Sequence, residues 1–144
     1  MLKEIAQYIL TKPETSDFTL GENFFTGHLP LKNTSNVEPP VRSVVLLERT
    51  PSAVVPDLPD RVDKAIQIWN RGASYFQAHA DAHLFFEILH GSVQWDLPLI
   101  VSGVEYTAMI INAVAAPAVL ENPDDRSKFV FSTNYIFMVM DKNA

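Results

Sequence analysis

The segment from Ile66 to Gly91 constrains the fold of this chain most strongly, because its apolar spacing changes part-way along. The run IQIWN at its start is typical of a strand, whose side chains point alternately to the two faces of a sheet. Beyond Gly72 the apolar residues recur every three or four positions, which is the spacing of an amphipathic helix. The segment therefore predicts a strand that turns at Arg71-Gly72 directly into a helix.

The predicted helix is apolar on two sides. One stripe should face the core, and it consists of Tyr75, Ala78, Ala82, Phe85 and Leu89. A second stripe lies well away from the first around the helix axis, and it consists of Phe76, Ala80, Leu84 and Ile88. Two apolar sides need two partners, so we expect a sheet on one side and the N-terminal helix or another subunit on the other. The helix should stop at Gly91, since a left-handed residue after the last turn satisfies free carbonyls.

The other segments predict one α+β domain spanning residues 1–144. Residues 2–11 have the pattern of a short amphipathic helix that Pro13 ends. Further strands are expected at Val41–Glu48, Val93–Val101, Val104–Ala113 and Lys128–Met140. The second and third of these strands should form a hairpin around Ser102-Gly103.

Breaker-rich segments separate these elements. Asp17–Pro30 reads as short extended pieces joined by turns, and loops are expected at Lys32–Pro40 and Ala115–Asp125. Residues 51–60 are rich in proline, which lacks the donor that a central strand needs. We expect an arm or long loop there, ordered against a neighbour.

Composition excludes several classes of function. The net charge is −6 and the eleven basic residues are scattered, which argues against a phosphate-binding surface and against recognition of nucleic acid. The absence of cysteine excludes disulfides, thiolate metal sites and cysteine nucleophiles. Because no signal peptide and no apolar run of about 18 residues is present, we expect a cytoplasmic protein without membrane contact. Only 19% of the residues are charged, and a surface poor in charge is often covered by something else.

Three histidines on one side of the predicted helix are the best candidates for chemistry. His79, His83 and His90 are spaced by four and seven residues, and Asp81 or Glu87 could add an oxygen ligand. The metalloprotease pattern is absent, because the residue after His79 is alanine instead of glutamate. We favour a solvated or interface stripe, with a metal-dependent enzyme that uses His79 and His83 as the alternative.

No other pattern supports catalysis. Asp124-Asp125-Arg126 lies beside an Asn-Pro turn, where an Asp that holds an Arg is the simpler interpretation. No GxSxG motif and no glycine-rich phosphate loop occurs. We therefore expect neither an enzyme nor a bound cofactor or metal.

Several short stretches, in this order, resemble the minor capsid or tail terminator proteins of long-tailed, non-contractile bacteriophages. They are FFTGHLP from Phe24 to Pro30, VVLLERTP, IQIWNRG followed by Tyr75 and Ala78, ILHG, Asp125-Arg126 and FSTN from Phe131 to Asn134. The chain departs from such sequences after its first strand, where Arg49-Thr50-Pro51 replaces a glycine-rich turn. The shape of that loop is therefore not implied.

The resemblance implies helices packed on a mixed sheet. Together with the patterns described above, it predicts a mostly antiparallel sheet, an N-terminal helix and one long central helix. It also implies a virion protein, assembled in the host cytoplasm, that forms a hexameric ring on the last ring of the tail tube protein. Such a ring ends tail growth and offers the head-completion or connector protein a joining surface. Another head-tail connector or neck protein is the alternative within this class.

Candidate interface residues follow from this resemblance, from the second helix stripe and from the proline-rich arm. They are Arg71, Asp125, Arg126, Phe76, Leu84, Val54 and Val55. Charged residues at the ends of elements can fix the register of a head-to-tail interface. We expect Arg71→Glu or Arg126→Glu to impair assembly more than folding.

Overall fold

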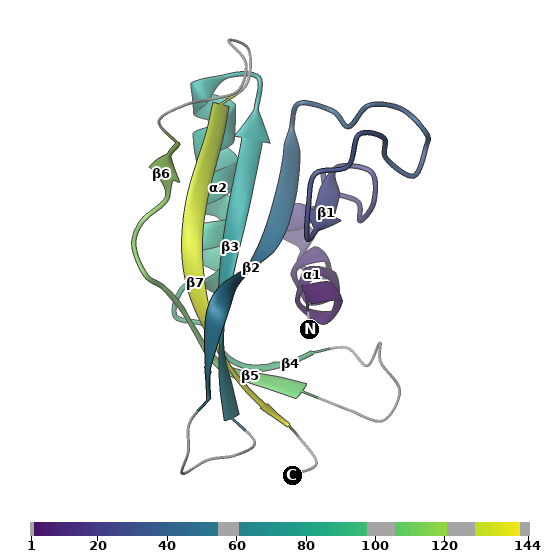
Figure 1. Cartoon of the computed structure of the whole chain (residues 1–144). Helices are drawn as coiled ribbons and strands as arrows, with labels where there is room; N and C mark the ends of the chain where they lie inside the picture. The colour runs from purple at the N-terminus through teal and green to yellow at the C-terminus, as the bar shows by residue number, and fades with distance from the viewer. Residues whose placement is uncertain (1, 55–60, 98–105, 121–128, 142–144) are drawn as a thin grey trace.

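The computed structural model describes residues 2–54, 61–97, 106–120 and 129–141. Within these residues a seven-stranded mixed sheet packs against two α-helices to form a single α+β domain (Figure 1). The α+β class and the single domain expected from the sequence agree with this arrangement.

The elements have the following bounds. The helices are α1 (Leu2–Leu10), a 3-10 turn η1 (Pro13–Thr15) and α2 (Tyr75–Leu89). The strands are β1 (Phe24–Thr26), β2 (Ser43–Val54), β3 (Arg61–Gly72), β4 (Val93–Asp96), β5 (Tyr106–Ala113), β6 (Ala118–Val119) and β7 (Phe129–Asp141).

The sheet runs in the order β1-β2-β3-β7-β5-β4, and the short β6 also pairs with β7. β1 lies parallel to β2, while every other pair of neighbouring strands is antiparallel. β4 and β5 pair antiparallel, as predicted, while the expected turn at Ser102-Gly103 lies outside the described residues. The mixed, mostly antiparallel character of the sheet therefore agrees with expectation.

The helix-facing side of the sheet carries the core. In the β3–β7 register, Ile66 lies opposite Tyr135 and Ile68 lies opposite Thr133, and all four side chains are buried. The helices supply the other half of this core, with α2 behind β3 and β7 and α1 beside β1 and β2 (Figure 1). Burial of aliphatic and aromatic side chains between the two layers supplies the main driving force for this arrangement.

The junction between β3 and α2 follows the sequence closely. Ser74 caps α2, because its side-chain oxygen accepts a 3.1 Å hydrogen bond from the backbone N–H of Gln77. Gly72 permits close approach, since a Cβ at this position would lie 3.0 Å from the backbone nitrogen of Ala78. Gly91 has a φ of +79°, which is the left-handed conformation expected after the last turn.

Some expectations need correction. Residues 51–54 are not an arm but the end of β2, and residues 55–60 lie outside the described residues. A proline is tolerated there because β1 covers only Val44–Leu46, so the rest of β2 is an edge, and because the β2–β3 register shifts between Arg49 and Ala53.

Two further differences concern lengths. The expected loop at Ala115–Asp125 contains the two-residue strand β6, which is too short to leave a periodic pattern in the sequence. The helix α2 has 15 residues, only a little longer than an average helix of about 11 or 12, so one long central helix is not confirmed.

Candidate functional site

The two apolar stripes of α2 have different surroundings. Ala78, Ala82, Phe85 and Leu89 of the first stripe are completely buried, as expected. Tyr75, the fifth residue assigned to that stripe, is instead 44% exposed, because the helix begins at the edge of the core. Asp81 takes a place on the buried side that the apolar pattern alone did not predict.

The second stripe faces outward. Phe76 is 80% exposed, Ala80 is exposed, and Leu84 and Ile88 are half-buried. The N-terminal helix packs against β1 and β2 and leaves Phe76 uncovered. Of the two partners considered for this stripe, the N-terminal helix therefore does not account for Phe76. A large apolar side chain this exposed often marks a contact surface when it continues into further apolar groups.

A row of aromatic rings runs along the side of α2 that borders β7. The rings of Tyr75 and His79 stack with centroids 5.9 Å apart, and those of His79 and His83 lie 4.2 Å apart. Phe131 of β7 meets His79 edge to face at 5.4 Å. Both histidines are half-buried in this row, which holds their rings close together.

The third histidine of the predicted stripe has a separate role. The Nδ1 atom of His90 accepts a 3.0 Å hydrogen bond from the backbone N–H of Ala113, and its ring stacks on Phe86 at 5.0 Å. His90 therefore joins the end of α2 to β5. Nowhere in the described part of the chain do three or more His, Asp or Glu residues gather as they would around a metal ion.

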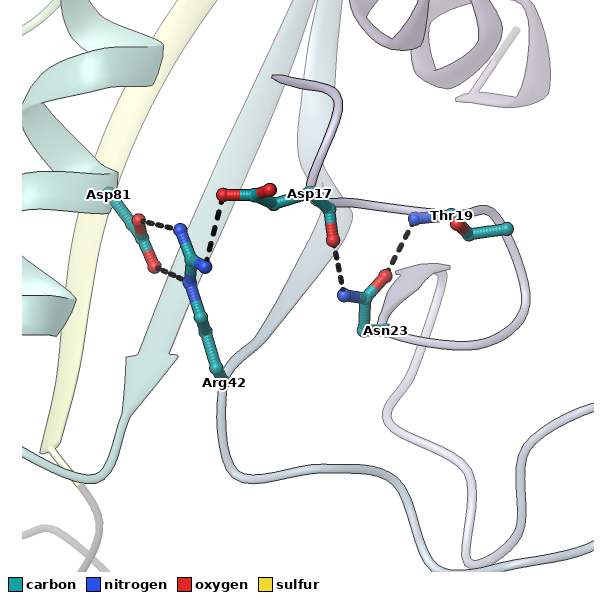
Figure 2. A network of polar contacts seen from close by, with 5 residues as sticks. All are labelled: Asp17, Thr19, Asn23, Arg42 and Asp81. Carbon is teal, nitrogen blue, oxygen red and sulfur yellow. Dashed lines mark hydrogen bonds and ion pairs between the residues drawn. The ribbon is translucent and has the colours of Figure 1, made fainter. Parts of the chain in front are cut away.

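Asp81 belongs to a network that ties the N-terminal third of the chain to α2 (Figure 2). The Nε and Nη2 atoms of Arg42 each donate a 2.9 Å hydrogen bond to one carboxylate oxygen of Asp81. Arg42 also contacts Asp17 at 3.2 Å, and its guanidinium lies over the ring of Phe18. The bonds to Asp81 raise the pKa of Arg42 above its ordinary value. This arrangement fixes the position of the segment before β2 relative to α2.

Comparison with models of known protein families and with curated protein sequences gives no match.

Arg71, a candidate interface residue, donates hydrogen bonds to groups of its own chain. Its Nε atom donates hydrogen bonds to the Val41 carbonyl at 3.0 Å and to Ser43 Oγ at 3.2 Å, and its Nη2 atom donates to the Pro40 carbonyl at 2.9 Å. Burial lowers the pKa of Arg71, an effect that Glu38 partly opposes. Its guanidinium also forms one wall of a groove of about 430 Å³ beside Leu31 and Lys32. These hydrogen bonds of Arg71 within the chain were not predicted from the sequence.

The remaining interface candidates lie partly outside what the structure describes. Leu84 lies on the outward stripe with Phe76. The backbone of Val54 pairs with Val62 at the end of β2. Val55, Asp125 and Arg126 are outside the described residues, and the described candidates Arg71, Phe76, Leu84 and Val54 are spread over β2, β3 and α2. None of the helices that the structure describes has the length and apolar character needed to span a membrane.

Sequence reasoning missed Arg42 and considered Asp81 only as a possible metal ligand, so it did not predict their ion pair. The usable signals were a basic residue directly before an apolar strand and an acidic residue among the small residues of a core stripe. A buried carboxylate needs a positively charged partner, so Asp81 on the core side of α2 called for one. The sequence did not indicate which of the eleven basic residues would serve.

Proposed function

We propose that this chain is a structural subunit of a bacteriophage virion that assembles as a ring, caps the tail tube and provides the surface for joining the head. In this account the protein has no chemistry of its own. The motif resemblance suggests the class, and the outward stripe of α2 is the observation that carries the proposal.

The outward stripe supports assembly through its exposure. Phe76 is 80% exposed and is followed along the helix by Ala80 and Leu84. Exposing a phenylalanine ring to water has no benefit for an isolated domain, whereas burying it against a partner contributes about 2 kcal/mol. A contact surface on α2 would bury this side chain and so explain its exposure in the single subunit.

A ring built head to tail needs a second, different surface on the same subunit. The segment between β1 and β2 offers one, because Leu31 is 93% exposed and Val37 is 55% exposed. Figure 1 shows this segment on the far side of β2 from α2. Two apolar surfaces at different places on the subunit suit a closed ring better than an isologous dimer, in which each subunit uses the same patch.

Disruption of the gene in its phage or prophage tests the proposal. Negative-stain electron microscopy of the particles should show overlong tails detached from filled heads, because tube growth no longer stops and joining fails. Normal tails attached to heads would overturn the proposal. Tails of normal length beside unjoined heads would instead assign the chain to the connector or neck class.

A further inference from the structure

We propose that His79 and His83 form a two-histidine binding site for a divalent transition metal such as Zn²⁺, with water in the remaining coordination positions. This inference does not depend on the virion proposal, because it rests only on the geometry of α2.

The spacing of the two residues meets the first requirement of such a site. Residues four apart on a helix are neighbours on its surface. Zinc–nitrogen bonds of about 2.0 to 2.1 Å at a near-tetrahedral angle place two ligating imidazole centroids about 5 Å apart. The ring centroids of His79 and His83 are 4.2 Å apart, so side-chain rotations that move the rings apart by less than about 1 Å bring them to that separation.

The ring nitrogens of both residues are available. His79 and His83 accept and donate no hydrogen bond among the described residues, although both are half-buried. His90 differs, because its Nδ1 atom already accepts from the backbone of Ala113. The three-histidine pattern in the sequence therefore reduces to a pair.

The surroundings restrict the motion of the pair. Tyr75 stacks on the His79 ring, and Phe131 contacts the same ring edge to face at 5.4 Å. Phe86 lies edge to face with the His83 ring at 6.3 Å. Rings held between aromatic neighbours lose less side-chain entropy on binding a metal than free side chains do.

No third histidine or acidic residue, Asp81 and Glu87 included, gathers with the pair as a ligand among the described residues. Both carboxylate oxygens of Asp81 accept hydrogen bonds from Arg42, so this residue is not available. Two imidazoles therefore leave positions open, which is the pattern of an accessible site and not of a closed structural one. Nitrogen ligands favour Zn²⁺, Ni²⁺ and Cu²⁺ over Mg²⁺ or Ca²⁺.

Isothermal titration of the intact chain with zinc chloride at about pH 7.5 tests the site, since ligating imidazole must be neutral. We expect saturation at one Zn²⁺ per chain and more than about tenfold weaker binding in His79→Gln and in His83→Gln. The matched control is His28→Gln, at an exposed position remote from α2 in sequence, which should bind like the wild type. Unchanged binding in His83→Gln, or no binding at millimolar Zn²⁺, would overturn the inference.

A second measurement covers variants that fold poorly. Paramagnetic Cu²⁺ added to the wild-type chain should broaden the ring resonances of Tyr75 and Phe131 before those of Tyr8, which packs on Trp95 instead of on the histidine pair. Equal broadening of all three would place the metal elsewhere and overturn the inference.

Discussion

Arg42 and Asp81 form a two-pronged ion pair, in which the guanidinium donates 2.9 Å hydrogen bonds to both oxygens of a carboxylate that is only 5% exposed. The two residues are 39 positions apart in the sequence, Arg42 before β3 and Asp81 after it. Bidentate pairs of this kind fix geometry as well as charge. The pair holds the segment that leads into β2 against α2, the helix whose outer side carries the exposed stripe (Figure 2).

Removing Arg42 should destabilise the fold more than neutralising Asp81 does. Arg42→Leu leaves the Asp81 carboxylate buried without its partner and should lower the free energy of unfolding by about 3 kcal/mol. Asp81→Asn removes the buried charge, keeps an oxygen acceptor and should cost only about 1 kcal/mol. Urea unfolding followed by circular dichroism measures both values. Equal costs would mean that the buried carboxylate is not the main source of the effect.

Arg71 should contribute to folding as well as to any interface. Arg71→Gln loses the hydrogen bonds to the carbonyls of Pro40 and Val41 and should cost about 2 kcal/mol. The control is Arg61→Gln, which removes a partly buried ion pair with Asp63 on the same strand but no bond to a backbone carbonyl, and should cost about 1 kcal/mol. Chemical denaturation compares the two variants. A negligible effect of Arg71→Gln would show that these hydrogen bonds do not stabilise the fold, and would leave Arg71 a role in assembly alone.

The junction between β3 and α2 should not tolerate a larger residue at Gly72. The added Cβ in Gly72→Ala would lie 3.0 Å from the nitrogen of Ala78 and 3.3 Å from its Cα, both backbone atoms that cannot rotate away. We expect a loss of about 1 to 3 kcal/mol in unfolding free energy. Ala73→Ser, at the exposed neighbouring position, should be nearly neutral. Similar melting temperatures for the two variants would show that the helix can shift without cost.

Tyr135 should make the fold sensitive to alkali. Burial raises the pKa of its phenol, an effect that Thr133 opposes only in part, and the side chain is 1% exposed. In the unfolded chain this phenol ionises at about pH 10. The stabilising contribution is therefore fully present below that value and is lost as the pH rises above it.

Tyr135→Phe removes this ionisation and should reduce the loss of stability between about pH 9 and 11. Thermal unfolding across this range measures the difference between the two proteins. If both lose stability equally, another group controls the alkaline transition.

The sequence was most informative where one residue type has one structural solution. The change of apolar period around Gly72 predicted the strand and the helix, and Gly91 predicted the helix end, because few residues adopt a positive φ without strain. The core stripe through Ala78, Ala82 and Phe85 follows directly from helix geometry.

The sequence was least informative where a partner distant in the chain decides the outcome. Proline argued against a strand at residues 51–54, yet the edge position of β2 makes one possible, and edge position depends on how short β1 is. The salt bridge of Arg42 and the hydrogen bonds of Arg71 depend on which loops meet in space. The histidine pattern gave three candidates on one side of a helix, and only the contact with Ala113 separates His90 from the other two.

The outward stripe can be tested in phage that lack the chain. Plasmids would supply the wild type, Phe76→Ser or Val114→Ser to the disrupted phage. Phe76 and Val114 are 80% and 67% exposed, so both substitutions should leave the fold within about 0.5 kcal/mol of the wild type. Val114 is not on α2 and serves as the matched control.

The most direct measurement of the central claim is the distribution of tail lengths in these complemented particles, recorded by negative-stain electron microscopy. Wild type and Val114→Ser should restore tails of uniform length joined to heads, whereas Phe76→Ser should leave overlong, unjoined tails. If particles without any functional copy of the chain already have tails of uniform length joined to heads, the proposed role in ending tail growth is contradicted. If Phe76→Ser also restores normal particles as well as the wild type does, the outward stripe of α2 is not the assembly surface.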